Sequence, residues 1–152
     1  MRRHGSGRGI PSPATLVVAS LSPDGGRAAS RTVSRASELA SLHLPRVLAE
    51  LRGGVVPEGW EPLTEGYFVC THGQRDVCCA ELGRPVAAAF EEAAGRAPVW
   101  EVSHLGGHRL APNMMLLPDG LHLGRVTAAD AAEVVAEFRA GRIGTARLRG
   151  RS

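Results

Sequence analysis

The sequence predicts a small α/β fold in which helices pack on a sheet. Over residues 66–140, short apolar runs alternate with helical stretches in the order β-α-β-β-β-α. The composition, with 43% hydrophobic and 22% charged residues, is typical of a chain that buries a core. A length of 152 residues allows one ordinary domain, or a domain of about 90 residues with a partial second one. We therefore expect a folded domain over residues 66–150, preceded by a partial or divergent segment over residues 1–65.

The amino-terminal segment is only weakly patterned. Residues 16–19 are compatible with a short strand. Residues 37–51 indicate a helix, which Pro45 is expected to kink or break because proline lacks the backbone N–H of a helix interior. Residues 57–65 are rich in proline and glutamate and mark the expected boundary between the two parts of the chain.

The secondary-structure signals become clearer from Gly66 onward. Residues 67–70 form a short apolar run that predicts a strand. Residues 84–94 predict a helix, with Pro85 in its first turn and Gly95 just beyond its end. This interpretation leaves the two adjacent cysteines between these elements in a loop.

The remaining elements follow in close succession. Residues 99–102 predict a second strand, and residues 114–117 and 121–126 predict a hairpin around a Pro-Asp-Gly turn. Thr127 can cap the last helix, and Gly141 marks its end. The apolar stripe of this helix consists of Ala131, Val134, Val135 and Phe138.

The composition also argues against a nucleic-acid partner. Aromatic residues make up 4% of the chain, which leaves few rings for stacking on nucleic-acid bases. All 18 basic residues are arginines, and they concentrate near the two ends, in segments rich in glycine, serine and proline. Such segments indicate solvated termini rather than a phosphate-binding stripe. We therefore expect no nucleic-acid partner.

The sequence also predicts a soluble protein of the cytoplasm. No apolar run approaches the roughly 20 residues of a membrane span, so we expect no membrane partner. Residues 14–21 are too short for an export signal and are more typical of a strand. The chain contains three cysteines, of which Cys78 and Cys79 are adjacent, and this argues against structural disulfides. Reduced thiols or metal ligands in the cytoplasm explain them better.

Candidate metal ligands gather after two predicted strands. The first stretch contains Cys70, His72, Cys78 and Cys79, and the second contains His104 and His108. Because parallel strands of a β-α-β unit end at the same edge of the sheet, we expect the two stretches to converge. Two thiolates and two imidazoles suit either a tetrahedral zinc ion or a 2Fe-2S cluster with mixed ligands.

The spacing of His104 and His108 also suits a helix, but Gly106 and Gly107 lie between them. Two glycines would cost a helix about 1 kcal/mol each relative to alanine, so we expect a loop. A glycine-rich loop lets both imidazoles turn toward one centre and exposes N–H groups to negatively charged sulfur.

Two other interpretations of these residues remain open. Cys79 could be a reactive thiol at the start of a helix with His104 as its partner, or the thiols could simply be packed as small hydrophobic groups. A thioredoxin-type dithiol requires C-x-x-C, which the chain lacks. Cys70 and His72 supply only one of the two ligand pairs that a Rieske centre needs.

Two longer stretches resemble the bacterial sucrase/ferredoxin-like family. They are VCTHGQRDVCCAELGRPVA (69–87) and VWEVSHLGGHRLAPNMMLLPDG (99–120), followed by GRV (124–126), and their RDxCC and HxGGH elements are specific. The ligand-bearing domain of this family is similar to thioredoxin-like 2Fe-2S ferredoxins. The resemblance covers about residues 66–150 and implies a thioredoxin-like ferredoxin domain. Residues 1–60 differ from the usual amino-terminal half of the family, which implies a shortened or divergent member.

The resemblance also implies a ligand set. In the family, a cysteine pair with eight intervening residues and both histidines of HxGGH are thought to hold the cluster. Carried over to this chain, the ligands are Cys70, Cys79, His104 and His108, and Cys78 is not a ligand.

Residues beside these ligands are expected to order the loops through hydrogen bonds. They are Arg75, Asp76, Gly106, Gly107 and Arg109. The resemblance implies a non-catalytic carrier of single electrons that exchanges them with an unidentified redox partner protein. The alternative is a structural zinc module with the same four ligands and no redox activity.

Overall fold

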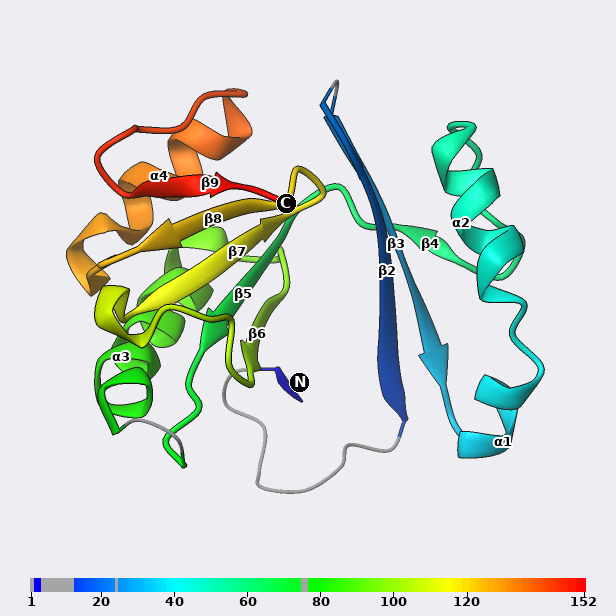
Figure 1. Cartoon of the computed structure of the whole chain (residues 1–152), viewed down its shortest axis with the longest axis horizontal. Helices are drawn as coiled ribbons and strands as arrows, with labels where there is room; N and C mark the ends of the chain where they lie inside the picture. Colours follow the sequence, from blue (N-terminus) through cyan, green and yellow to red (C-terminus); the bar gives the residue numbers. More distant parts are fainter. Residues whose placement is uncertain (1, 4–12, 24, 75–76) are drawn as a thin grey trace. The chain divides into compact units, whose positions relative to one another are not determined.

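The structure is a computed structural model of the chain, and it describes residues 2–3, 13–23, 25–74 and 77–152 (Figure 1). The described residues divide into two compact units. The carboxyl-terminal unit contains residues 66–116 and 120–152 together with residues 2–3. The amino-terminal unit contains residues 13–23 and 25–65 together with residues 117–119.

The carboxyl-terminal unit is built on a six-stranded sheet with the order β1-β6-β5-β7-β8-β9. The strands are β1 (Arg2–Arg3), β5 (Gly66–Cys70), β6 (Val99–Val102), β7 (Asn113–Leu117), β8 (Leu121–Gly124) and β9 (Leu148–Arg151). Strands β5 and β6 are parallel, with Cys70 opposite Val102, whereas β7, β8 and β9 pair in antiparallel fashion. The predicted parallel β-α-β unit is therefore confirmed.

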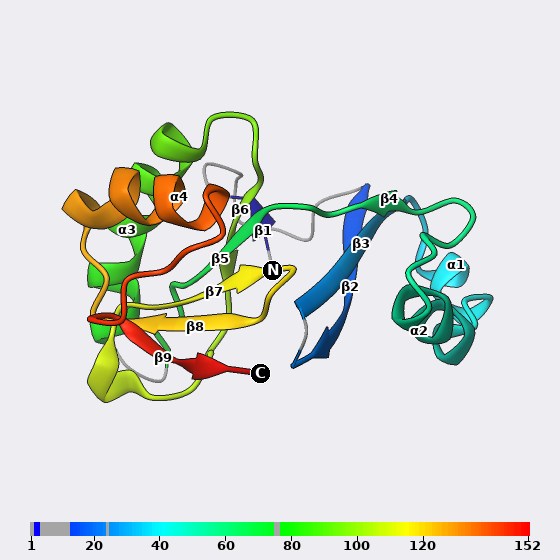
Figure 2. The ribbon, with the colours of Figure 1, turned by 90° about the horizontal axis from the view of Figure 1, so that it is seen from above.

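Two helices, α3 (Val77–Ala94) and α4 (Ala131–Arg139), pack against each other on one face of this sheet (Figure 2). Short 3-10 turns, η1 (His108–Leu110) and η2 (Ala128–Asp130), precede β7 and α4. The predicted order β-α-β-β-β-α and the α/β fold class are confirmed, although β1 and β9 were not predicted. In the described parts of the chain, no helix has both the length and the apolar character that a membrane span requires.

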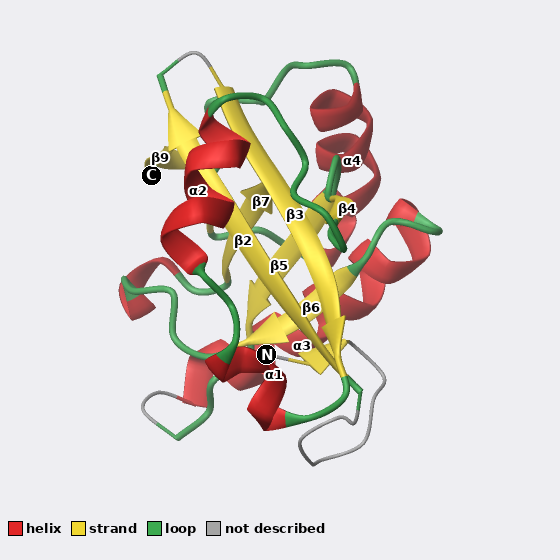
Figure 3. Ribbon diagram, turned by 90° about the vertical axis from the view of Figure 1, so that its right-hand side faces the viewer, coloured by secondary structure: helices red, strands yellow, loops and turns green. Residues whose placement is uncertain are grey.

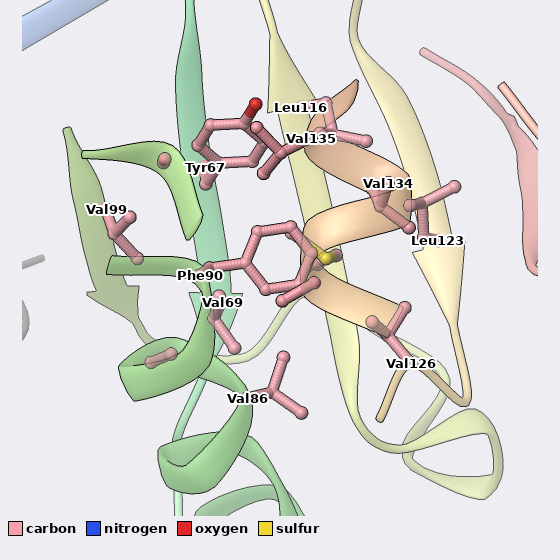
Figure 4. Close-up of a cluster of buried hydrophobic side chains, with 14 residues drawn as sticks. Tyr67, Val69, Val86, Phe90, Val99, Leu116, Leu123, Val126, Val134 and Val135 are labelled. Carbon is pink, nitrogen blue, oxygen red and sulfur yellow. The ribbon is translucent and has the colours of Figure 1, made fainter. Parts of the chain in front are cut away.

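Aromatic side chains form the centre of the core between the sheet and the helices (Figure 4). The ring of Tyr67 on β5 lies 5.3 Å from that of Phe90 on α3 and 6.0 Å from that of Phe138 on α4, measured between centroids. Tilted and edge-on ring contacts of this kind add to the stabilisation from burial. They tie both helices to the strand that ends at Cys70.

Helix α3 begins seven residues earlier than predicted. The prediction placed Pro85 in the first turn, but the structure places it inside the helix that starts at Val77. Pro85 cannot donate to the carbonyl of Glu81, and both residues lie on the exposed side of the helix, where water can satisfy that carbonyl. The earlier start moves Cys78 and Cys79 from the predicted loop into the first turn of α3.

A capping box at Thr127 starts the turn η2, which leads directly into α4. The sequence predicted Thr127 as the cap of α4 itself. The Asp130 carboxylate accepts hydrogen bonds from the backbone N–H and the hydroxyl of Thr127, at 2.7 and 2.6 Å. It also pairs with the guanidinium of Arg147, whose Nε lies 2.7 Å away. Burial alone would raise the pKa of Asp130, but the Thr127 hydrogen bonds and the Arg147 charge lower it below its ordinary value. Asp130 therefore stays ionised and anchors the chain just before β9.

The amino-terminal unit contains a second sheet (Figure 3). It also has its own small core of buried side chains. The sheet has the strands β2 (Ala14–Ser22), β3 (Gly25–Val33) and β4 (Glu61–Pro62), all antiparallel. Helix α2 (Leu44–Arg52) packs on β2 and β3, and Trp60 is buried beside it. The strand predicted over residues 16–19 is longer, and β3 was missed because its sequence, GGRAASRTV, contains only one large apolar residue.

The helix predicted over residues 37–51 is two helices. The first, α1 (Ala36–Ala40), ends before His43, and α2 begins at Leu44 with Pro45 in its first turn. Proline is tolerated in a first turn because that N–H has no partner within the helix. The predicted break at Pro45 is therefore confirmed, and the residue starts a helix rather than kinking one.

Candidate metal centre

Three of the predicted ligands come together at one edge of the carboxyl-terminal sheet. Cys70 ends β5, Cys79 lies in the first turn of α3, and His104 lies in the loop after β6. One donor atom from each, Sγ or a ring nitrogen, lies within 4.8 Å of the other two. Both cysteines are fully buried, whereas His104 is exposed. The group therefore has a buried thiol side and an exposed imidazole side.

The strand end that carries Cys70 is held to its parallel neighbour by the next residue. The backbone N–H of Thr71 donates to the carbonyl of Val102 at 3.1 Å. The Thr71 hydroxyl donates to Oε2 of Glu101 at 2.9 Å, and Glu101 is only 5% exposed. These bonds hold the end of β5 against the end of β6, from which the loop of His104 departs.

The position of Cys79 depends on a close approach between α3 and β5. Gly83 lies one turn after Cys79, and a Cβ atom at Gly83 would sit 2.2 Å from the carbonyl oxygen of Cys70. Only glycine lets the helix come this near to the strand. The close approach at Gly83 therefore places the Cys79 side of α3 beside the end of β5.

The loop between the two histidines is not helical, as predicted. Gly106 and Gly107 have φ angles of +80° and +69°, in the left-handed region that favours glycine. His108 is exposed at the start of η1 and lies outside the group of three donors. The structure thus brings together Cys70, Cys79 and His104, and His108 as fourth ligand remains a prediction.

The other candidate residues lie at or near this edge with different exposure. Cys78 is exposed on α3, next to buried Cys79. His72 is half-buried, and Arg109 is exposed on η1. Arg75 and Asp76 lie outside the described residues, so their predicted roles stay predictions.

Two side chains that contact the loop between His104 and His108, here called the histidine loop, are not predicted by the sequence. Asn113 and Arg149 both hydrogen-bond to glycine carbonyls in this loop. The sequence predicts a solvated terminus for the segment that contains Arg149. Asn113 follows Pro112, and no local pattern indicates its contact with Gly107. Only the pairing of β7, β8 and β9 places them beside the loop.

The donor set fits a centre with mixed cysteine and histidine ligands. Donor atoms on one tetrahedral metal ion lie about 3.5 Å apart, given bonds of about 2.0–2.3 Å. The group of three, with all separations within 4.8 Å, is compact enough to share an ion. Thiolate and imidazole together suit zinc and also iron in a 2Fe-2S cluster.

Solved structures with a similar fold include a thioredoxin-like 2Fe-2S ferredoxin from Aquifex aeolicus. The likeness has a TM-score of 0.52 and 19% sequence identity, and it covers 58% of this chain and 92% of that chain. Another structure of the wild-type ferredoxin gives a TM-score of 0.51, again at 19% identity, over 57% of this chain and 97% of that chain. The described residues thus contain a thioredoxin-like ferredoxin fold. Among curated proteins, none matches the chain.

The family model for sucrase/ferredoxin-like proteins matches residues 13–150. This match begins well before residue 66, so it includes the amino-terminal unit that the sequence resemblance had left out. It also spans both stretches that carry the candidate ligands. Because the match covers most of the length of this chain, the chain belongs to the sucrase/ferredoxin-like family.

Proposed function

We propose that the protein is an electron carrier that binds a 2Fe-2S cluster through Cys70, Cys79, His104 and His108. The observation that carries this proposal is the convergence of Cys70, Cys79 and His104, which come from three different elements, with donor atoms within 4.8 Å. The similar solved structures are described as 2Fe-2S ferredoxins, which supports the choice of cofactor. A bound cluster would supply one-electron oxidation and reduction.

The cysteines and the histidines among the proposed ligands would hold the cofactor from different sides. Cys70 and Cys79 are fully buried, so their thiolates would hold the cofactor from the protein side and exclude water there. His104 and His108 are exposed, so their imidazoles would hold it from the solvent side. Electrons would then enter and leave on the histidine side, where a redox partner protein can approach. This function needs no substrate pocket, and we place it in the cytoplasm, where thiols stay reduced.

The cofactor can be identified on protein purified without oxygen. We expect visible absorption bands and iron and acid-labile sulfide in equal amounts, as a 2Fe-2S cluster requires. Reduction with dithionite should bleach the bands reversibly. Colourless protein with stoichiometric zinc would instead establish the structural zinc module, for which the compact group of three donors is also suitable.

The midpoint potential of the loaded protein is expected to fall as pH rises. An iron-bound imidazole keeps a second nitrogen that can lose a proton, and this loss adds negative charge that favours the oxidised form. With one proton per electron, the slope is about 59 mV per pH unit. Protein-film voltammetry between about pH 6 and 10 measures it. The His104→Cys variant should show a lower potential and a weaker slope, and a flat midpoint in the wild type would argue against histidine ligation.

A further inference from the structure

We propose that Asn113 and Arg149 are positioning residues that hold the loop between His104 and His108 in the form that brings His104 to one centre with Cys70 and Cys79. The identity of that centre rests on the function proposed above. The contacts that hold the loop, however, belong to the chain itself and can be tested without a cofactor.

Asn113 is the first residue of β7, and it is only 1% exposed. Its Nδ2 donates a hydrogen bond to the carbonyl of Gly107 at 3.0 Å, and its Oδ1 accepts one from Nη1 of Arg149 at 2.8 Å. The nitrogen and the oxygen of the buried Asn113 amide therefore both form hydrogen bonds. One end holds the loop, and the other end holds the second positioning residue.

Arg149 reaches the same loop from β9, near the other end of the carboxyl-terminal unit in sequence. Besides Asn113, its Nη1 contacts the carbonyl of Gly106 at 3.3 Å. The carbonyls of Gly106 and Gly107 are consecutive, and they lie between the two histidines. Two strands thus hold the two central peptide groups of the loop.

Two glycines provide the space that the Arg149 side chain occupies. A Cβ atom at Gly107 would lie 2.5 Å from Nη2 of Arg149, and one at Gly124 would lie 2.7 Å from its Cδ. The side chain therefore lies directly over both glycines. Gly107 has a second reason to be glycine, since its φ of +69° disfavours other residues.

The strand that carries Arg149 is itself anchored. Leu148 pairs with Leu123 of β8, and Arg147 forms the ion pair with Asp130 described above. The arginine is thus presented from a fixed backbone, although the residue is exposed. This anchoring allows a residue late in the chain to act on a loop more than 40 residues earlier.

The loop needs such support because of its composition. Two consecutive glycines have more backbone freedom than any other pair, and fixing one residue costs about 1–2 kcal/mol of conformational entropy. Outer hydrogen bonds that orient metal ligands typically change metal affinity by about 10–100-fold when they are removed. Asn113 and Arg149 therefore limit the backbone freedom of the loop that carries His104 before any cofactor binds.

The first test uses the cofactor-free full chain and hydrogen exchange. The N–H of Leu110 bonds to the carbonyl of Gly107, and the N–H of Ala111 bonds to that of His108, so both amides report on the loop. In Arg149→Ala we expect these two amides to exchange about ten times faster, with core amides of α4 unchanged. Unchanged exchange at both reporters would overturn the proposal. Arg149→Ala alters an exposed side chain, so this variant should fold even if Asn113→Ala, at a buried position, does not.

The second test measures how fast the reconstituted protein loses its iron to a chelator, by the decay of visible absorption. Arg149→Ala should lose iron about tenfold faster and shift the absorption bands. Arg149→Lys keeps a cationic nitrogen with several donors and should restore most of the wild-type lifetime. Arg96→Ala, which changes an exposed arginine just beyond the far end of α3, is the matched control and should behave as wild type.

The two tests separate the failure of this proposal from the failure of the proposed function. If the wild type takes up no iron, the electron-carrier function fails, and the exchange rates alone decide whether the loop is held. If the wild type takes up iron but Arg149→Ala loses it at the wild-type rate with unchanged bands, Arg149 is an ordinary surface residue and the proposal fails.

Discussion

Cys70→Ser and Cys79→Ser are each expected to abolish the iron content and visible absorption of the purified protein. Each change removes a buried thiolate from the group of three donors, and a serine hydroxyl is a far weaker ligand for iron or zinc. We expect at least a tenfold loss of bound iron, measured by metal analysis and absorption after anaerobic reconstitution.

Cys78→Ser provides the matched control for these two variants. Cys78 is adjacent to Cys79 in the first turn of α3, but it is exposed, whereas Cys79 is buried. Its variant should therefore keep the iron and colour of the wild type. If Cys78→Ser were colourless and Cys79→Ser coloured, the ligand assignment would be wrong by one residue.

Gly83→Ala is expected to destabilise the carboxyl-terminal unit, although alanine is the better helix former. At an ordinary exposed helix position this exchange stabilises by about 1 kcal/mol. Here the new Cβ would lie 2.2 Å from the carbonyl oxygen of Cys70 and 3.4 Å from Cγ2 of Thr71, so α3 must move away from β5. Overpacking of this kind typically costs about 1–3 kcal/mol. Because Cys79 lies one turn away, we also expect weaker iron binding.

Chemical denaturation of the cofactor-free variants measures the effect on the free energy of unfolding. Ala88→Gly makes the reverse exchange at an exposed position of the same helix, and it should lower stability by about 1 kcal/mol through helix propensity alone. Both exchanges are thus expected to lower the free energy of unfolding, Gly83→Ala through overpacking and Ala88→Gly through helix propensity. A Gly83→Ala variant more stable than wild type would show that the close approach of α3 to Cys70 does not occur.

Several features of the fold could be predicted because their signals are local. The strands at residues 67–70 and 99–102 are short apolar runs, and the helix after Thr127 has both a cap and an apolar stripe. These signals depend on side chains a few residues apart, so the order β-α-β-β-β-α followed from the sequence. The first two turns of α3 were missed because Pro85 is normally a signal for a helix start. The close approach of Gly83 to Cys70, which packs this part of the helix on β5, leaves no local signal.

The candidate site was predictable in its chemistry but not in its geometry. The sequence by itself determined which donors are available, and the parallel β-α-β pattern determined that the ends carrying Cys70 and His104 lie at one edge of the sheet. Only the tertiary structure decided that Cys79 sits on a helix, beside Cys70, with His108 outside the group of three. It also decided that Asn113 and Arg149 reach the histidine loop. These contacts join strands and loops far apart in sequence, and they depend on backbone approaches such as that at Gly83, which no local pattern encodes.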